Sequence, residues 1–328
     1  MQKSIEKPFV LAVAGPTASG KTWLGVELAK KYGGEVVSAD SMQIYKGMDI
    51  ASAKPTEEEM QGIPHHLIDI LDRGVSFSAA DYVRLAKEAI EDILSRGRLP
   101  IIVGGTGLYI DSLLRNVHFS PVGSDPEYRS RLYERIRTEG NGAVYRELEQ
   151  LDPAAAEKIH MNNIVRLVRA MEVIHVSGRP FSELKAESLR EASPYDSLII
   201  GLNAADRSLL YDRIDQRVDE MVQRGLVEEA RQLWKSGELD RYGTVSCGEV
   251  RTSANAIGCK ELVPYFEGTA SLGDCIASIK QETRHYAKRQ LTWFKRNEYI
   301  RWVIIGDFSK KNEILEKSVN AIEIYKNM

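Results

Sequence analysis

The residues from Gly15 to Thr22 carry the clearest chemical pattern in this sequence. They read GPTASGKT and fit the phosphate-binding loop (P-loop) pattern G-x-x-x-x-G-K-[ST] at every defined position. In such a loop, main-chain N–H groups surround phosphate oxygens, and the following helix points the positive end of its dipole at the anion. We expect Lys21 to lie across the outer phosphates and the Thr22 hydroxyl to bind Mg²⁺. The pattern therefore predicts that a diphosphate or triphosphate group binds to Gly15, Pro16, Thr17, Ala18, Ser19, Gly20, Lys21 and Thr22.

A carboxylate follows the next apolar run. Residues 34–38 (GEVVS) predict a short strand, and Asp40 comes just after it. Because ligands of open parallel sheets bind at the carboxyl ends of the strands, we expect Asp40 beside the P-loop. There it could order the water around a metal ion or act as a general base. The alternative is an aspartate that only shapes a turn with its neighbours.

Two glycines and a threonine follow a third apolar run. Residues 101–103 predict a strand that ends in Gly104, Gly105 and Thr106. Many ATP-hydrolysing proteins place a Mg²⁺-binding aspartate at such a strand end, so its absence argues against ATP hydrolysis. The glycines predict close approach of a ligand to the main chain, with Thr106 as its hydrogen-bond partner. A tight turn without a functional role is the alternative.

Basic residues recur after position 200. Arg213 and Arg217 are one turn apart on a predicted helix and share a face. Either could neutralise a departing diphosphate, or pair with nearby aspartates. We name Arg217 as the diphosphate-binding candidate, although spacing alone does not decide between the two. Residues 280–301 hold seven basic residues against two acidic ones, with Tyr286, Trp293 and Phe294 among them. This mixture suits a nucleic-acid backbone with stacked bases, or a solvated face above core aromatics.

The order of the elements predicts an α/β fold. We expect a parallel sheet that contains the P-loop, with helices on both faces, and strands at 9–14, 34–38, 65–70, 101–103, 198–202 and 302–305. We expect helices at 23–31, 78–95, 208–221, 226–236 and 272–294, with Ser78 and Asp81 capping the second. Residues 126–190 have no central-strand pattern and predict helices at 126–137, 142–150, 153–159 and 164–176. We therefore expect a catalytic core of residues 1–115 and 198–328, and an inserted helical subdomain of residues 116–197.

The composition is that of an ordinary globular protein, with 43% apolar and 28% charged residues. No apolar run is long enough for a membrane span. The net charge of −3 argues against indiscriminate nucleic-acid binding but leaves room for a local basic face. Cys247, Cys259 and Cys275 have the spacing of neither a zinc site nor a disulfide framework. We expect a cytoplasmic monomer.

Five segments together resemble the bacterial tRNA dimethylallyltransferase (tRNA isopentenyltransferase) family. They are residues 15–22, 40–49 (DSMQIYKGMD), 104–109 (GGTGLY), 166–172 (RLVRAME) and 283–294 (TRHYAKRQLTWF). The resemblance implies transfer of a dimethylallyl group from dimethylallyl diphosphate to N6 of an adenosine in tRNA. That adenosine is at position 37, next to the anticodon, in tRNAs reading codons that begin with U. The implied partners are the tRNA anticodon stem-loop, dimethylallyl diphosphate and Mg²⁺.

The resemblance also assigns roles to residues of this sequence. It implies that Asp40 accepts the proton of the adenine amine, that Lys21 holds the diphosphate, and that Thr106 contacts the target nucleotide. The target base must leave its stack to reach a buried site. The inserted subdomain would bind the stem-loop. The residues expected to contact tRNA are Asp40, Ser41, Met42, Gln43, Thr106, Arg129, Val165, Arg166, Leu167, Val168 and Arg169.

Two departures and two alternatives accompany this interpretation. The family commonly has a glutamine where this chain has Val165, and an aromatic residue where it has Cys259. Arg166 and Arg169, three residues apart, could clamp neighbouring phosphates or simply form a solvated helix face. A P-loop kinase of small molecules would explain the loop and Asp40 but not the basic segments. An RNA-binding protein with a vestigial loop would not need Lys21 and Asp40.

Overall fold

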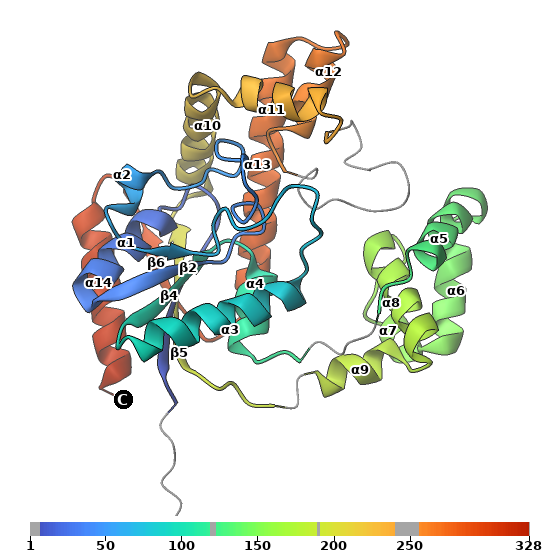
Figure 1. Cartoon of the computed structure of the whole chain (residues 1–328), viewed down its shortest axis with the longest axis horizontal. Helices are drawn as coiled ribbons and strands as arrows, with labels where there is room; N and C mark the ends of the chain where they lie inside the picture. The colour runs from blue at the N-terminus through green and yellow to red at the C-terminus, as the bar shows by residue number, and fades with distance from the viewer. Residues whose placement is uncertain (1–6, 119–122, 189–190, 240–255, 328) are drawn as a thin grey trace, which may run out of the picture. The chain divides into compact units, whose positions relative to one another are not determined.

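The computed structural model describes residues 7–118, 123–188, 191–239 and 256–327, and its secondary structure is α/β, as predicted (Figure 1). Six parallel strands form one sheet in the order β3-β2-β4-β1-β5-β6. The strands are β1 (Phe9–Ala14), β2 (Gly34–Ser38), β3 (His65–His66), β4 (Leu99–Gly104), β5 (Asp196–Ala204) and β6 (Ile300–Ile305). Because the strands are parallel, the carboxyl ends of neighbouring β1, β4 and β2 meet at one edge of the sheet.

Helices cover both faces of this sheet. Alternate residues of a strand point to opposite faces, and in β1 Val10 and Ala12 pack against α3 (Ala79–Ser95) and α4 (Gly107–Leu114). Leu11 and Val13 pack on the other side against α1 (Lys21–Tyr32) and α14 (Lys311–Lys326). Burial on both faces explains the unbroken apolar run of β1.

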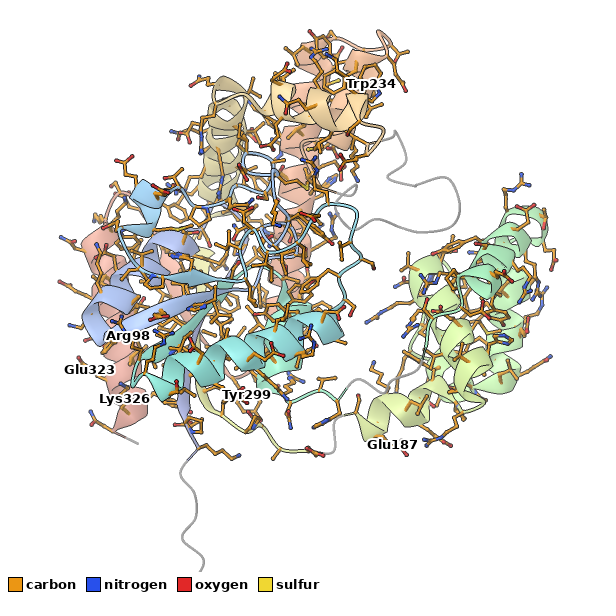
Figure 2. The ribbon with its side chains drawn as sticks, viewed as in Figure 1. Arg98, Glu187, Trp234, Tyr299, Glu323 and Lys326 are labelled. Atoms are coloured by element: carbon orange, nitrogen blue, oxygen red, sulfur yellow. The ribbon has the colours of Figure 1, made fainter. Side chains whose placement is uncertain are left out.

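The later helices form a cluster beside the sheet. It contains α10 (Arg207–Gln223), α11 (Leu226–Lys235), the 3₁₀ turn η2 (Lys260–Leu262), α12 (Val263–Phe266) and the long α13 (Leu272–Phe294). Trp234 of α11, labelled in Figure 2, packs against Phe266 with the ring centroids 5.5 Å apart. The other end of α13 reaches the sheet core, where Phe294 is fully buried. This single helix therefore connects the helical cluster with the sheet.

Residues 115–193 form a second compact unit. It contains α5 (Pro126–Glu139), α6 (Asn141–Leu151), α7 (Pro153–Ala156), α8 (Ile164–Ser177) and α9 (Phe181–Glu187). Its own core is built by Leu132, Val144, Leu148, Leu167 and Met171, among others. The sequence prediction ended this insertion at residue 197, but β5 already begins at Asp196. We call residues 115–193 the helical unit, and the rest of the described chain the catalytic unit.

Local sequence signals account for most element boundaries. β1, β2 and α13 have the predicted bounds. The predicted cap of α3 is confirmed, because Ser78 and Asp81 form a reciprocal capping box. The predicted strand at 65–70 was wrong beyond His66, since Leu67 and Asp69 have positive φ angles of 62° and 56° and leave the extended conformation. The helices that were not predicted include α4, α9, α14 and the short α2 (Glu57–Met60). In the described ranges no helix is both long and apolar enough to cross a membrane.

Candidate active site

A pocket of about 430 Å³ opens at the carboxyl ends of β1, β2 and β4 in the catalytic unit. Its wall combines the loops after these three strands with side chains of α10 and α13. The predicted site residues that line it are Thr17, Lys21, Thr22, Asp40, Ser41, Met42, Gln43 and Arg217. Gly104 and Gly105 also line it, and Thr106 follows them directly. The fold thus gathers three segments that are far apart in the sequence.

The loop between β1 and α1 has the backbone that a phosphate-binding loop needs. Gly20 precedes α1 with φ 87°, and no side chain caps this helix, so its first-turn N–H groups are left for an anion. At Gly15 a Cβ atom would lie 2.7 Å from the carbonyl oxygen of Leu202, so a larger residue would push the loop off β5. The Ser19 hydroxyl is buried and makes no hydrogen bond to any described residue.

Two cations stand beside this loop inside the pocket. Lys21 donates from Nζ to the carbonyl oxygen of Pro16 at 2.6 Å. Burial and the nearby charge of Arg217 lower the pKa of Lys21 to about 7, although Asp40 opposes the shift. Burial also lowers the pKa of Arg217, whose Nη2 donates to the carbonyl oxygen of Ala53 at 3.4 Å. An anionic ligand would relieve the cost of burying both positive charges.

Arg213 has a different place from Arg217. Its Nε donates to the carbonyl oxygen of Ala18 at 2.9 Å, and its guanidinium lies 4.3 Å from the ring centroid of Phe308. Ala18 has a positive φ of 61°, which is uncommon for a residue with a side chain. The Arg213 side chain therefore binds a main-chain carbonyl group of the P-loop, whereas Arg217 lines the pocket.

Asp40 shapes a turn and also lines the pocket, so the two interpretations of this residue are compatible. Its Oδ1 accepts the N–H groups of Met42 at 2.8 Å and of Gln43 at 3.4 Å, as in an Asx turn. Its Oδ2 makes no hydrogen bond to the described part of the chain. The Thr106 hydroxyl accepts the N–H of Ser41 at 3.2 Å, and the Thr106 N–H donates to Ala39 at 3.1 Å. These bonds join the loop after β4 to the loop after β2.

The oxygen donors of the pocket fit a magnesium ion. The Thr22 hydroxyl and the Asp40 carboxylate both line it, and hard oxygen ligands are those that Mg²⁺ prefers. Within the described ranges, no group of three or more His, Cys, Asp or Glu side chains could hold a metal ion. Mg²⁺ usually takes one or two protein ligands and completes its shell with water and substrate phosphates, so the Thr22 hydroxyl would fit as one of these ligands.

Comparison with known proteins adds an independent observation. The family model described as IPP transferase matches residues 43–297. The chain is 47% identical over 308 residues to the tRNA dimethylallyltransferase of Caldanaerobacter subterraneus subsp. tengcongensis, covering 94% of this chain and 95% of the relative. The chain belongs to the IPP transferase family.

Solved structures of similar proteins support the same assignment. The tRNA isopentenylpyrophosphate transferase of Bacillus halodurans aligns with a TM-score of 0.69 and 41% identity, over 98% of this chain and 99% of that one. A eukaryotic dimethylallyltransferase acting on tRNA aligns with a TM-score of 0.79 and 29% identity, over 96% of this chain and 78% of that one. The fold of this IPP transferase family member is therefore that of its solved relatives.

In the helical unit of this IPP transferase, one buried carboxylate organises two of the predicted RNA-binding arginines. Glu172 of α8 has no exposed surface. It accepts hydrogen bonds from Arg129 and Arg169, both at 2.7 Å, and from the Asp125 N–H at 3.0 Å. Burial opposes its charge, but these hydrogen bonds prevail and hold the pKa of Glu172 below its ordinary value. Arg129 and Arg169 remain partly exposed beyond this ion pair.

The segment 165–169 divides between surface and core. The side chains of Val165 and Arg166 are exposed, and that of Val165 keeps 71% of its surface. Leu167 and Val168 are 0% and 1% exposed and belong to the core of the helical unit. α8 turns these two side chains inward to pack against α5 and α6, while the contact of this segment with tRNA stays a prediction.

The aromatic residues of α13 are less available for stacking than the sequence suggested. Phe294 is buried in the sheet core, so it cannot stack on a base. The Trp293 Nε1–H donates to Asp111 at 2.7 Å, while Tyr286 lines the pocket. Arg284 is paired with Asp215 of α10. Five basic side chains of the predicted segment stay exposed: Lys288, Arg289, Lys295, Arg296 and Arg301.

Tyr286 and Gln290 line the pocket and were not predicted as site residues. Gln290 is 6% exposed and hydrogen-bonds to main-chain atoms of two site loops. Tyr286, one turn earlier, interacts through its hydroxyl with Thr106 and Gln290, and burial raises its pKa. Their spacing of four residues places them on one face of α13, which is the signal that could have identified them.

Proposed function

We propose that this protein transfers a dimethylallyl group from dimethylallyl diphosphate to N6 of adenosine 37 in tRNAs reading codons that begin with U. One observation carries the proposal. A single pocket contains a phosphate-binding loop with two partly buried cations, and a carboxylate in the loop that hydrogen-bonds to Thr106. Such a pocket suits a reaction whose leaving group is an anionic diphosphate and whose nucleophile must lose a proton.

The leaving group would be held by the P-loop side of the pocket. Thr17, Lys21 and Arg217 line this side. Charge grows on the diphosphate as its bond to the allylic carbon breaks, and fixed cations in a partly dry site stabilise that charge. The Thr22 hydroxyl would hold Mg²⁺ here, and the ion would add further neutralisation of the diphosphate.

The acceptor would be held by the other side of the pocket. An adenine amine is a weak nucleophile, so a carboxylate that takes its proton as the new bond forms lowers the barrier. Asp40 is a carboxylate of the pocket wall, in the loop after β2, and its Oδ2 makes no hydrogen bond to the described atoms. Thr106 and the segment Asp40–Gln43 would contact the target nucleotide, which must leave its stack to enter.

The helical unit would bind the anticodon stem-loop through Arg129, Arg166 and Arg169. The exposed basic residues of α13 would extend this contact in the catalytic unit. Because tRNA is the proposed acceptor, we propose that the protein works in the cytoplasm, as a monomer.

A transfer assay tests the proposal. The protein is incubated with labelled dimethylallyl diphosphate, unmodified tRNA and Mg²⁺, and we expect label in tRNA at adenosine 37. A matched tRNA with guanosine at position 37 should remain unlabelled. ATP-dependent phosphorylation of a small metabolite without transfer to tRNA would overturn the proposal in favour of a P-loop kinase.

A further inference from the structure

Gln290 of α13 connects the two pocket loops that follow the neighbouring strands β1 and β4. Its Oε1 accepts the main-chain N–H of Thr17, in the P-loop, at 2.8 Å. Its Nε2 donates to the main-chain carbonyl oxygen of Gly105, in the loop after β4, at 3.0 Å. The side chain is 6% exposed, so neither bond competes with bulk water.

The chemistry of the two partners fixes the orientation of this amide. A main-chain N–H can only donate and a main-chain carbonyl can only accept, so the oxygen of Gln290 must face Thr17 and its nitrogen must face Gly105. Both ends of the side chain are thereby used on main-chain atoms. Because these partners belong to the main chain, a side-chain substitution at Thr17 or Gly105 does not remove the N–H or the carbonyl group itself.

The space around this contact is closed. A Cβ atom at Gly105 would lie 2.1 Å from Nε2 of Gln290, which no real contact tolerates. Glycine at position 105 and glutamine at position 290 therefore fit each other. Any side chain at position 105 would displace the amide from its place.

The helix that carries Gln290 is itself anchored. One turn further along α13, the Trp293 Nε1–H donates to Oδ2 of Asp111 at 2.7 Å. The amide of Asn297 donates to Oδ1 of the same carboxylate at 3.1 Å. Asp111 lies on α4, so this end of α13 is fixed to a helix that packs on the sheet. Gln290 thus reaches the two loops from a rigid support.

We propose that Gln290 is a positioning residue that sets the separation between the P-loop and the Thr106 loop. This proposal rests on the proposed function, in which the P-loop holds the leaving diphosphate and the Thr106 loop holds the attacking nucleotide. Gln290 then determines the distance between the allylic carbon and the amine without touching either. A displacement of about 1 Å between reacting groups can slow a reaction by about 100-fold.

The first test removes both hydrogen bonds with little change in volume. In Gln290→Leu, we expect the single-turnover rate of transfer to fall by roughly 10–100-fold. The dissociation constants for tRNA and for a non-reactive diphosphate analogue should change by less than about threefold, because the groups that contact them remain. The control is Ser318→Ala, which removes a buried hydrogen bond to the carbonyl oxygen of Ile314 on α14, away from the pocket, and should lower stability but leave the transfer rate nearly unchanged.

A double-mutant cycle tests whether the contact itself is responsible. Gly105→Ala should displace Gln290 and slow transfer about as much as Gln290→Ala. If both act through one contact, the double variant will be no slower than Gln290→Ala alone, since the clash has been removed. Losses that multiply in the double variant would overturn the proposal.

Hydrogen exchange gives a readout that does not depend on activity. The Thr17 amide should exchange at least about tenfold faster in Gln290→Leu than in the wild type, since its acceptor is gone. Unchanged exchange, or a transfer rate in Gln290→Leu equal to that of Ser318→Ala, would overturn the inference. Absence of transfer by the wild type would instead overturn the proposed function, while the exchange result would still report on the Gln290 contact.

Discussion

The Oδ1 atom of Asp40 accepts the main-chain N–H of Met42 at 2.8 Å. This bond orients the carboxylate so that one oxygen shapes the turn after β2 and the other remains for chemistry at the pocket wall. The two functions can therefore be separated by substitution.

Asn and Ala at position 40 should have the same catalytic effect but different structural effects. Asp40→Asn keeps an acceptor for Met42 and loses the base, so we expect the transfer rate to fall by roughly 100–10,000-fold with an unchanged melting temperature. Asp40→Ala loses the turn as well and should also cost about 1 kcal/mol of folding free energy. Single-turnover kinetics and thermal unfolding check both. Transfer by Asp40→Asn at the wild-type rate would exclude Asp40 as the base.

Diphosphate binding should be coupled to proton uptake by Lys21. The pKa of Lys21 is about 7 in the ligand-free pocket, and a bound anion favours its charged form. Affinity for a non-reactive diphosphate analogue should therefore be constant below about pH 7 and fall above it, by at most about tenfold per pH unit. Calorimetry in buffers of different ionisation enthalpy measures the proton uptake directly.

Lys21→Arg is the control for this coupling, since arginine stays charged throughout this range. Its affinity should lose the pH dependence above pH 7. A wild-type affinity that is flat between pH 7 and 9 would contradict the assignment. The lowered pKa also affects folding stability. Between pH 7 and the ordinary pKa of lysine, Lys21 is protonated in the unfolded chain but mostly deprotonated in the folded chain. In this range the free energy of unfolding therefore rises with pH.

Arg217 and Arg213 should differ in what they contribute. Arg217 lines the pocket, so Arg217→Gln should weaken binding of the diphosphate analogue by roughly 10–100-fold, the value of a hydrogen bond to a charged group. Arg213 contacts the Ala18 carbonyl instead, so Arg213→Gln should lower the melting temperature and weaken binding less. Titration calorimetry and thermal unfolding distinguish the two. The opposite order of affinities would show that the loop moves to bring Arg213 to the ligand.

Among the described charged side chains of the helical unit, Glu172 should contribute the most to the free energy of unfolding. Glu172→Gln leaves Arg129 and Arg169 without their buried counter-charge, and we expect a loss of about 1.5–3 kcal/mol, because both arginines stay partly hydrated. Urea unfolding followed by circular dichroism measures it. Glu134→Gln, which breaks an exposed pair with Arg137, should change little. Because the pKa of Glu172 is lowered, its contribution is present at neutral pH and is lost as the pH falls through the folded-state pKa.

Arg129 should contribute to tRNA binding and not to diphosphate binding. Arg129→Gln should weaken tRNA binding several-fold and reduce the slope of log affinity against log salt by about 1, as expected for one lost phosphate contact. Affinity for the diphosphate analogue should stay the same. Arg137→Gln on the same helix, which contacts Glu134 rather than Glu172, is the matched control. Equal losses for both ligands would indicate that Arg129 is structural.

The sequence by itself determined the elements whose cause is local. The P-loop pattern predicted the turn before α1, apolar runs predicted β1 and β2, and a capping box predicted the start of α3. These features depend on residues within about one turn or strand of each other, so spacing is enough to identify them. The expected meeting of Asp40, Thr106 and the P-loop followed from the rule that parallel strands end at one edge.

Only the tertiary structure decided the features that join distant parts of the chain. It placed Arg217 in the pocket and Arg213 against Ala18, although both lie on one face of α10. It buried Leu167 and Val168, and it connected Gln290 to two loops far away in sequence. Burial and hydrogen bonding between distant residues depend on how the elements pack, and a pattern along the chain does not contain that geometry.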